Sequence, residues 1–157
     1  MPVIYPPDSI YIPANHTSIF LAGSIEMGKA EDWQQKVITA IDSMNVTILN
    51  PRRAAWNADW EQTIFNPDFK GQVSWELEGL ERASLILVYF EPTTKAPVSM
   101  LEFGLYARSG KLLVCCPDGF WRKGNIDIVC ERYSITQVSD LESLIQSAKV
   151  YLNTLIL

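Results

Sequence analysis

Glu102 is the residue of this sequence best placed to do chemistry. It lies in the segment 97–110, directly after the apolar run 85–90, which we interpret as a buried strand. Pro97 suits the first position of a helix, and Gly110 suits the residue that ends one. Glu102 would then stand about two turns into an otherwise apolar helix, above the carboxyl end of a strand, where open α/β sheets bind ligands. The alternative is a solvated glutamate on a helix surface.

Two further stretches are suited to binding a ligand at the same edge. The run 17–22 ends in Gly23 and Ser24 ahead of a helix, so backbone N–H groups of that loop can face a ligand. Residues 51–68 have no clean helical period, and a loop of that length is more often functional than idle. This loop contains Trp56, Asp59 and Trp60. Two tryptophans suit a flat aromatic ligand such as a nucleobase, although packing the loop onto the domain is an equal alternative.

Apolar runs alternate with amphipathic stretches along the chain. The predicted strands cover 17–22, 46–49, 85–90, 111–115 and 134–138. The predicted helices cover 29–44, 69–83, 97–110 and 127–132, with a last helix opened by a capping box at 139–142. This alternation predicts a mostly parallel five-stranded sheet with helices on both faces, in a single Rossmann-like or flavodoxin-like α/β domain over 17–157. Residues 1–16 hold four of the nine prolines, and we interpret them as an extended arm on the domain or on a neighbouring subunit.

The composition narrows the class of protein. A chain of 157 residues with 48% hydrophobic and 20% charged residues can form one globular domain with a sizeable core. A net charge of −5 without a basic block argues against nucleic-acid polymers as partners. No apolar run approaches the roughly 18 residues of a membrane span, and the N-terminus lacks the basic region of a secretory signal. The three cysteines have neither disulfide nor metal spacing, and we expect Cys115 and Cys130 to be buried free thiols, which fits a reducing cytoplasm. We expect no metal, because the sequence has no cluster of His, Cys and carboxylate residues, and no cofactor.

Three motifs connect the chain to a known family. They are Phe20-Leu21-Ala22-Gly23-Ser24, the stretch 76–84 and Leu101-Glu102-Phe103-Gly104-Leu105. Together they resemble a divergent branch of the nucleoside 2-deoxyribosyltransferase family, which also contains nucleoside 5′-monophosphate N-glycosidases, over roughly residues 17–152. The family places its nucleophile in a Glu-Leu-Gly context, so the resemblance implies that Glu102 is that nucleophile.

The resemblance also implies roles for residues outside this motif. Glu76 stands where the family has a carboxylate on its second helix. Asn125, with Asp127 beside it, is the counterpart of an asparagine that reaches the sugar hydroxyls from an adjacent subunit. The implied substrates are deoxynucleosides and free nucleobases, in base salvage or in the handling of modified bases.

The transfer of 2-deoxyribose sets two chemical requirements. Cleaving the C1′–N bond leaves cationic character on the sugar, which an ionised Glu102 answers by forming a glycosyl ester. Ser99, one turn earlier, can hydrogen-bond Glu102 or the sugar. The departing base needs a proton, which a second carboxyl with a raised pKa can supply. Glu76 is the first candidate for this acid, and Asp59 and Glu91 are rivals from the flanking loops.

Transfer also needs water kept away from the ester. The aromatic residues that could form a dry stacking pocket are Trp56, Trp60, Trp75, Tyr89 and Phe120. A neighbouring subunit that closes the site would have the same effect, so we expect a homo-oligomer with shared active sites. Two alternatives stay open, a nucleotide N-glycosidase on the same fold and a nucleotide-binding module without catalysis. Glu26 beside the first glycine loop and the acidic chain favour an uncharged nucleoside.

Overall fold

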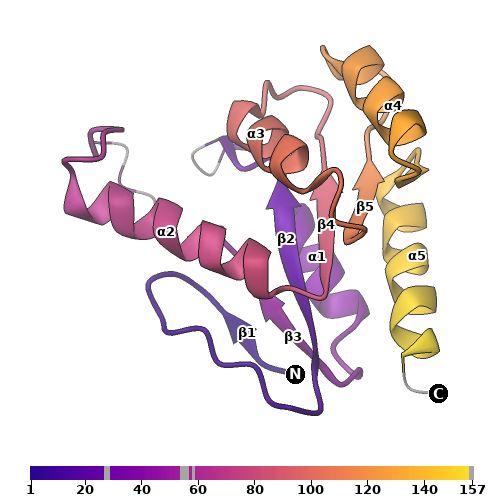
Figure 1. The fold of residues 1–157 in the computed structure, drawn as a ribbon, viewed down its shortest axis with the longest axis horizontal. Coiled ribbons are helices and arrows are strands. Elements are labelled where there is room, and N and C mark those ends of the chain that lie inside the picture. Colours follow the sequence, from indigo (N-terminus) through magenta and orange to yellow (C-terminus); the bar gives the residue numbers. More distant parts are fainter. Residues whose placement is uncertain (27–28, 54–56, 58, 156–157) are drawn as a thin grey trace.

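A parallel sheet organises the computed structural model, which describes residues 1–26, 29–53, 57 and 59–155 (Figure 1). Its strands are β1 (Val3–Ile4), β2 (Thr17–Gly23), β3 (Val46–Leu49), β4 (Leu85–Tyr89), β5 (Leu112–Cys115) and β6 (Thr136–Val138). They lie in the order β1-β3-β2-β4-β5-β6, and each neighbouring pair is parallel. The part β3-β2-β4-β5-β6 has the flavodoxin-like order, so the chain crosses from one side of β2 to the other on its way to β4.

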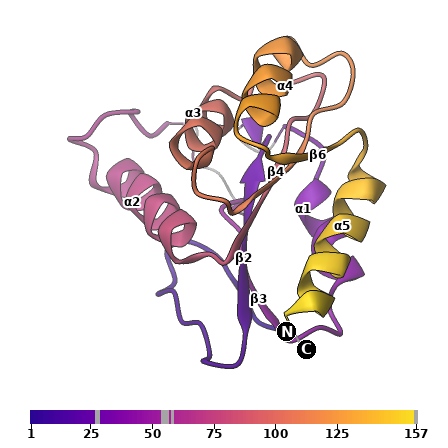
Figure 2. The same ribbon diagram turned by 45° about the vertical axis from the view of Figure 1, so that its right-hand side comes forward.

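The helices form a layer on each face of the sheet. They are α1 (Trp33–Ala40), α2 (Pro67–Arg82), α3 (Pro97–Tyr106), α4 (Lys123–Arg132) and α5 (Leu141–Thr154). Helices α1 and α5 cover one face, and α2, α3 and α4 cover the other (Figure 1 and Figure 2). In β2, Ile19 and Leu21 point toward the first layer, and Phe20 and Ala22 point toward the second. The predicted α/β fold with helices on both faces is confirmed.

The sheet has six strands rather than five, because the N-terminal arm supplies an edge strand. This strand, β1, is two residues long and lies between prolines, so it carries no alternating pattern that the sequence could reveal. The next part of the arm packs on α2. The Trp75 indole N–H donates to the Asp8 carbonyl at 2.9 Å, and the Arg82 guanidinium donates to the Ile10 carbonyl at 2.8 Å.

Helices α1 and α2 begin at residues other than those that the hydrophobic period predicts, because capping residues determine their starts. Helix α1 begins at Trp33 rather than at residue 29, because the Asp32 side chain accepts a hydrogen bond from the Gln35 N–H. Helix α2 begins at Pro67, ahead of the predicted residue 69, behind an Asn66 cap.

The other helix boundaries show the same kind of difference. The predicted capping box at 139–142 is wrong by one residue, since Asp140 accepts the Ser143 N–H at 2.7 Å and caps α5. Helix α4 begins at Lys123 rather than at residue 127, and α3 ends at Tyr106, before Gly110. Boundaries therefore depend on local hydrogen bonds that the apolar period does not record.

Two observations bear on the environment of the chain. None of the helices that the structure describes is long and apolar enough to span a membrane. The three cysteines are buried free thiols, which confirms the expectation for Cys115 and Cys130. The cytoplasmic location stays a prediction.

Candidate active site

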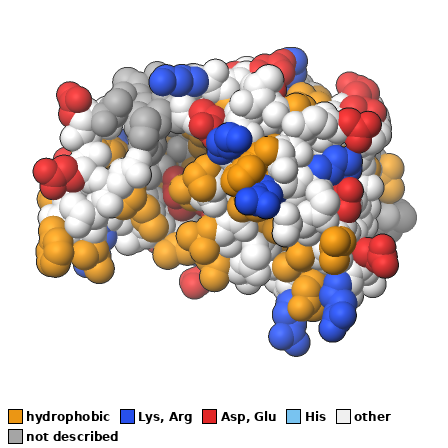
Figure 3. Space-filling model, turned by 90° about the horizontal axis from the view of Figure 1, so that it is seen from above, with side chains coloured by type: hydrophobic (Ala, Val, Ile, Leu, Met, Phe, Trp, Pro, Cys, Tyr) orange, Lys and Arg blue, Asp and Glu red, His pale blue; other side chains and the backbone are white. Residues whose placement is uncertain are grey.

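A cavity of about 340 Å³ lies at the carboxyl ends of β2 and β4. Gly23 at the end of β2 pairs with Tyr89 at the end of β4, and this is the switch point where open α/β sheets bind ligands. The cavity is lined by the segment after β2, the N-terminal half of α2 and the first turns of α3. Figure 3 views the molecule from above and shows the hollow, with an acidic side chain in its depth.

Gly23 lines the cavity at a position where no larger residue fits. A Cβ atom on Gly23 would stand 2.4 Å from the Tyr89 carbonyl oxygen and 2.7 Å from Cζ2 of Trp33. Its φ of 151° is also one that side chains rarely allow. Close packing against Tyr89 and Trp33 therefore accounts for a glycine at the start of the predicted ligand loop.

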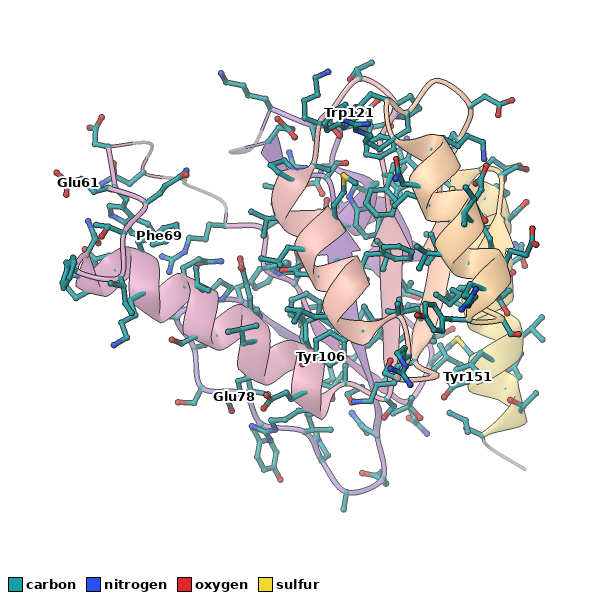
Figure 4. The ribbon with its side chains drawn as sticks, turned by 45° about the horizontal axis from the view of Figure 1, so that its top comes forward. Glu61, Phe69, Glu78, Tyr106, Trp121 and Tyr151 are labelled. Carbon is teal, nitrogen blue, oxygen red and sulfur yellow. The ribbon has the colours of Figure 1, made fainter. Side chains whose placement is uncertain are left out.

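Helix α2 presents one side of its N-terminal half to the cavity. The residues on this side are Phe69, Gln72, Val73 and Glu76. Their spacings of three and four residues place them on one face of the helix. Asn66 fixes the start of the helix, because its side chain accepts a hydrogen bond from the Phe69 N–H at 3.0 Å. Figure 4 labels Phe69 in this half of α2.

Helix α3 delivers Ser99 and Glu102 to another wall of the cavity. Ala96 precedes the helix with a left-handed backbone, at φ 46°, and Pro97 takes the first helical position. The Ala96 N–H donates to the Glu26 carboxylate at 2.8 Å, so the segment after β2 anchors the start of α3. Ser99 and Glu102 are one turn apart, and only 5% and 8% exposed.

The surroundings of Glu102 favour the neutral form of its carboxyl group. Burial, followed by the charge of Glu76, raises the pKa of Glu102 from 4.5 to about 8. Among the described residues, none donates a hydrogen bond to its carboxyl group. An enclosed carboxylate without a donor or a cation is costly, so the neutral acid is favoured. These surroundings disfavour the ionised form of Glu102 that the sequence led us to expect.

Glu76 faces the same cavity in different surroundings. Its Oε1 accepts a hydrogen bond from Gln72 Nε2 at 2.8 Å, and Gln72 Oε1 accepts one from Arg53 Nε. Burial raises the pKa of Glu76, while the Gln72 hydrogen bond and the Arg53 charge oppose that increase. The carboxyls of Glu76 and Glu102 interact electrostatically. Two such acids can hold one proton between them.

Ser24 and Glu91 lie outside the cavity lining and hold the loops together. The buried Ser24 hydroxyl contacts Thr94 Oγ1 at 2.7 Å and accepts the Glu91 N–H at 2.9 Å. The Glu91 carboxylate accepts hydrogen bonds from the N–H and the hydroxyl of Thr93. The polar groups of both residues are thus used within the loop from β4 to α3, and contacts of either with a ligand stay predictions.

Most of the predicted aromatic pocket belongs to the hydrophobic core. The residues concerned are Trp75, Tyr89 and Phe120. They pack into the two apolar layers against the sheet, and none of them lines the cavity. The aromatic ring on the described cavity wall is that of Phe69. The expectation of a stacking pocket made by those three residues is therefore corrected.

The loop before α2 reaches the site through Arg53. The Arg53 guanidinium carbon lies 4.8 Å from the centroid of the Trp60 ring. Trp60 itself is not among the described residues that line the cavity. Asp59 is exposed and does not line the cavity. Trp56 lies outside the described residues.

Asn125 and Asp127 lie on α4, away from this cavity. Asp127 accepts hydrogen bonds from Lys123 Nζ at 2.9 Å and from Gln137 Nε2 at 2.6 Å. Asn125 lines a separate groove between α3 and α4. A contribution of either residue to an active site would have to be made to another subunit, and it stays a prediction.

Three polar residues of the site were not predicted as binding residues. They are Glu26, Gln62 and Gln72. Gln72 stands four residues before Glu76 on one predicted helix, so the spacing could have paired them. Glu26 follows the glycine loop that was expected to face a ligand, so its place in the lining agrees with that expectation. Gln62 comes from a segment without a periodic pattern, and no sequence signal indicated that it shares a cavity with Glu102.

The fold and the cavity define an α/β protein with a cavity at the switch point, lined by two carboxyls that interact electrostatically. The chain belongs to a family described as "Nucleoside 2-deoxyribosyltransferase like", which matches residues 16–120. A crystal structure of a conserved protein from Enterococcus faecalis V583 is similar in fold, with a TM-score of 0.62 and 16% identity. The similarity covers 87% of this chain and 99% of that chain. No curated protein matches the sequence.

Proposed function

We propose that this protein transfers 2-deoxyribose between nucleobases, through a deoxyribosyl ester of Glu102. The observation that carries the proposal is the coupled pair of carboxyls, Glu76 and Glu102, on two helices around one cavity at the switch point. Membership of the family supports the chemical class. The pair supplies the nucleophile and the acid that a double displacement at C1′ needs.

The pair meets the needs of the reaction with a single proton. As the C1′–N bond of the deoxynucleoside breaks, the Glu102 carboxylate bonds to C1′, and the proton of the pair passes by way of Glu76 to the departing nitrogen. In the second half, Glu76 takes the proton of the acceptor base, whose nitrogen displaces Glu102 from C1′. Two inversions return the β configuration.

The charge of the cavity favours an uncharged nucleoside. Three carboxyls line the cavity, those of Glu26, Glu76 and Glu102, and its described lining contains no Lys or Arg. Such a surface stabilises a cationic sugar in the transition state and repels a 5′-phosphate. Deoxynucleosides and free nucleobases are therefore the proposed substrates, and salvage of bases is the proposed role.

A homo-oligomer is part of this proposal. Val98, Leu101 and Leu105 on α3 are 57%, 63% and 58% exposed, and their spacing places them in one stripe. An apolar stripe in water is typical of an interaction surface. Because Val98 also lines the cavity, a second copy on this stripe would border the site and help to exclude water from the ester.

One observation favours a second candidate, a deoxynucleoside 5′-monophosphate N-glycosidase. The start of α3 has no side-chain cap, and Val98 and Ser99 in its first turn line the cavity. Backbone N–H groups at a helix start can bind a phosphate.

Base exchange between deoxyadenosine and a free purine tests the proposed function. The wild-type protein should form the new deoxynucleoside, and it should act on deoxyadenosine 5′-monophosphate much more slowly. Hydrolysis of the monophosphate without base exchange would replace the proposal by the second candidate.

Substitution of the two acids tests their roles. Glu102→Ala should reduce exchange to background, and a deoxyribosyl adduct on Glu102 should be detectable by mass spectrometry in the wild type. Glu76→Gln should slow exchange by about 10²- to 10⁴-fold, the usual contribution of a general acid. Glu78→Gln, on the same helix but outside the cavity, is the control. Unchanged turnover in Glu102→Ala would remove Glu102 from the mechanism.

A further inference from the structure

Gln72 connects an arginine to one of the two acids. Its Nε2 donates to Glu76 Oε1 at 2.8 Å and to the Pro51 carbonyl at 3.3 Å, and its Oε1 accepts from Arg53 Nε. Because a guanidinium only donates, Arg53 fixes the amide oxygen toward itself and the amide NH₂ toward Glu76. Gln72 is 1% exposed, so the protein rather than water determines this orientation.

The Arg53 guanidinium, which donates to Gln72, also contacts the ring of Trp60. Its guanidinium carbon lies 4.8 Å from the centroid of the Trp60 ring. A planar cation that stacks on an indole and donates along its edge has little freedom to turn. Trp60, Arg53, Gln72 and Glu76 thus form an ordered series from the loop before α2 to the cavity.

We propose that Arg53 and Gln72 are positioning residues that keep Glu76 ionised and leave the proton of the acid pair on Glu102. The Gln72 amide donates a hydrogen bond to Glu76, and the positive charge of Arg53, which binds that amide, also stabilises the negative charge of Glu76. Glu102 has no such donor among the described residues. The inference rests on the proposed function, since it assigns the resting place of the proton that the departing base receives.

The other ionisable groups around Glu76 do not favour the ionisation of Glu76 over that of Glu102. Glu102 faces it from α3, and Glu26 lines the same cavity from the segment after β2, with its carboxylate bound to the Ala96 N–H. Both are acids, and each disfavours a second charge nearby. The described lining contains no Lys or Arg. The charge of Arg53, which acts from behind Gln72, therefore distinguishes the two carboxyls.

This arrangement has a consequence for the reaction. In the resting site the nucleophile is neutral, and the charge of the pair lies on the neighbouring acid. When the proton moves from Glu102 through Glu76 to the base nitrogen, Glu102 gains the electron pair that it donates to C1′. The nucleophile is thus released only as the leaving group is protonated.

Carbon-13 NMR of the side-chain carboxyls of glutamate tests the inference without any turnover. Glu76→Gln and Glu102→Gln assign the two signals. In the wild type, Glu76 should titrate at lower pH than Glu102. In Arg53→Gln and in Gln72→Leu, Glu76 should titrate at higher pH, so that the gap between the two midpoints narrows or reverses. Arg53→Lys, which keeps a charge and a donor, should restore most of the gap.

Matched variants exclude a general effect of the substitutions. Gln146→Leu removes a similar glutamine–glutamate hydrogen bond, of 3.0 Å to Glu142, from the exposed face of α5. Arg82→Gln removes a guanidinium from the far end of α2. Neither should change the titration of the pair.

Each result has a definite meaning for the inference. An unchanged titration midpoint of Glu76 in both Arg53→Gln and Gln72→Leu would overturn the inference. Because Arg53 lies in a loop, Arg53→Gln alone decides the matter if Gln72→Leu does not fold. The acid limb of the base-exchange rate should move to higher pH in the same two variants. A wild type without base exchange but with the expected titrations would count against the proposed function alone.

Discussion

Glu76 and Glu102 carry the same functional group in different surroundings. Glu76 has an amide donor, Gln72, at 2.8 Å. Glu102 is 8% exposed and receives no hydrogen bond from the part of the chain that the structure describes. An acid enclosed in this way keeps its proton, because ionisation would not regain the water that burial removed. The neighbours of each carboxyl, rather than its chemical type, therefore determine its charge.

Glu102→Gln should stabilise the protein more at high pH than at low pH. The pKa of Glu102 is about 8 in the folded protein, against 4.5 for an ordinary glutamate. Between these values the folded state binds more protons than the unfolded state, so the free energy of unfolding of the wild type should fall as pH rises through this range. Glu102→Gln cannot ionise and should lack this decrease. Urea unfolding at about pH 5 and about pH 8.5 measures the difference.

Glu78→Gln is the control for this experiment. Glu78 is exposed on α2 and pairs with Arg82 at 2.8 Å. Its substitution should leave the pH dependence of unfolding as in the wild type. If Glu102→Gln kept the full wild-type dependence, the raised pKa of Glu102 would be wrong.

Gly23→Ala should destabilise the fold by about 1–3 kcal/mol, the usual cost of overpacking. Its Cβ would stand 2.4 Å from the Tyr89 carbonyl oxygen, so β2 and β4 would have to separate at the cavity. Gly71→Ala is the matched control, since nothing lies within 4 Å of a Cβ at that position in α2. That control should gain about 0.5–1 kcal/mol from helix propensity. Thermal unfolding of both variants measures the contrast, and equal stabilities would contradict the crowding at Gly23.

The end of α4 shows how one residue determines a helix boundary. Ser134 follows the helix with a left-handed backbone, at φ 54°. The Ser134 N–H donates to the Glu131 carbonyl at 3.4 Å, and the Ile135 N–H donates to the Cys130 carbonyl at 2.9 Å. This pair of bonds is a Schellman motif, whose left-handed position is usually occupied by glycine.

Ser134→Gly should therefore stabilise the protein by about 1 kcal/mol, because glycine adopts this conformation without strain. Ser147→Gly, in the interior of α5, should instead destabilise it by about 0.5 kcal/mol. Chemical unfolding of the two variants provides the test. A loss of stability in Ser134→Gly would show that the serine side chain matters more than the backbone strain.

The hydrophobic pattern predicted the type and order of the main elements and left their ends undetermined. Strands buried on both faces read as continuous apolar runs, so β2 to β5 were visible in the sequence. The starts of α1 and α5 depend on the side chains of Asp32 and Asp140, which cap helices that the apolar period alone would begin elsewhere. The strand β1 depends on pairing with β3 and has no local signal.

Some residues of the candidate site could be predicted from the sequence, and others depend on contacts that the sequence does not record. Gly23, Ser99 and Glu102 occupy positions that strand ends and helix starts determine, and the sequence placed them near one another. The partner of Glu76 depends on a contact between Arg53 and Gln72, which come from different segments. Trp75 lies in the core, where its indole N–H donates to the Asp8 carbonyl of the arm, and no pattern within α2 records that contact.

At the scale of the whole molecule, the exposed apolar stripe on α3 is the proposed contact between copies of the chain. Leu105→Lys should therefore reduce the self-association of the protein. A lysine in this stripe would place an unpaired charge in the proposed contact between copies. Light scattering should then report a mass near that of the 17.7 kDa chain, and base exchange should fall with it. Val150→Lys, at a 64% exposed position on α5, is the control and should leave the mass unchanged. A wild type that is already monomeric would contradict the shared site.

Mixing of two inactive variants tests whether the sites are shared. If Asn125 acts on the sugar from a neighbouring subunit, Glu102→Gln and Asn125→Ala chains should recover activity when they are combined. Neither parent should show that activity alone. If the mixture stayed inactive, each active site would be formed by a single chain.

The positions of the chain ends have a practical consequence. The N-terminus and the last turn of α5 lie at the low edge of the molecule in Figure 1, whereas the cavity lies at the carboxyl ends of β2 and β4. An affinity tag or a surface anchor attached at either end would therefore leave the entrance open to solution. Immobilised protein should accept small molecules as readily as free protein does, which makes it suitable for screening libraries of nucleoside analogues.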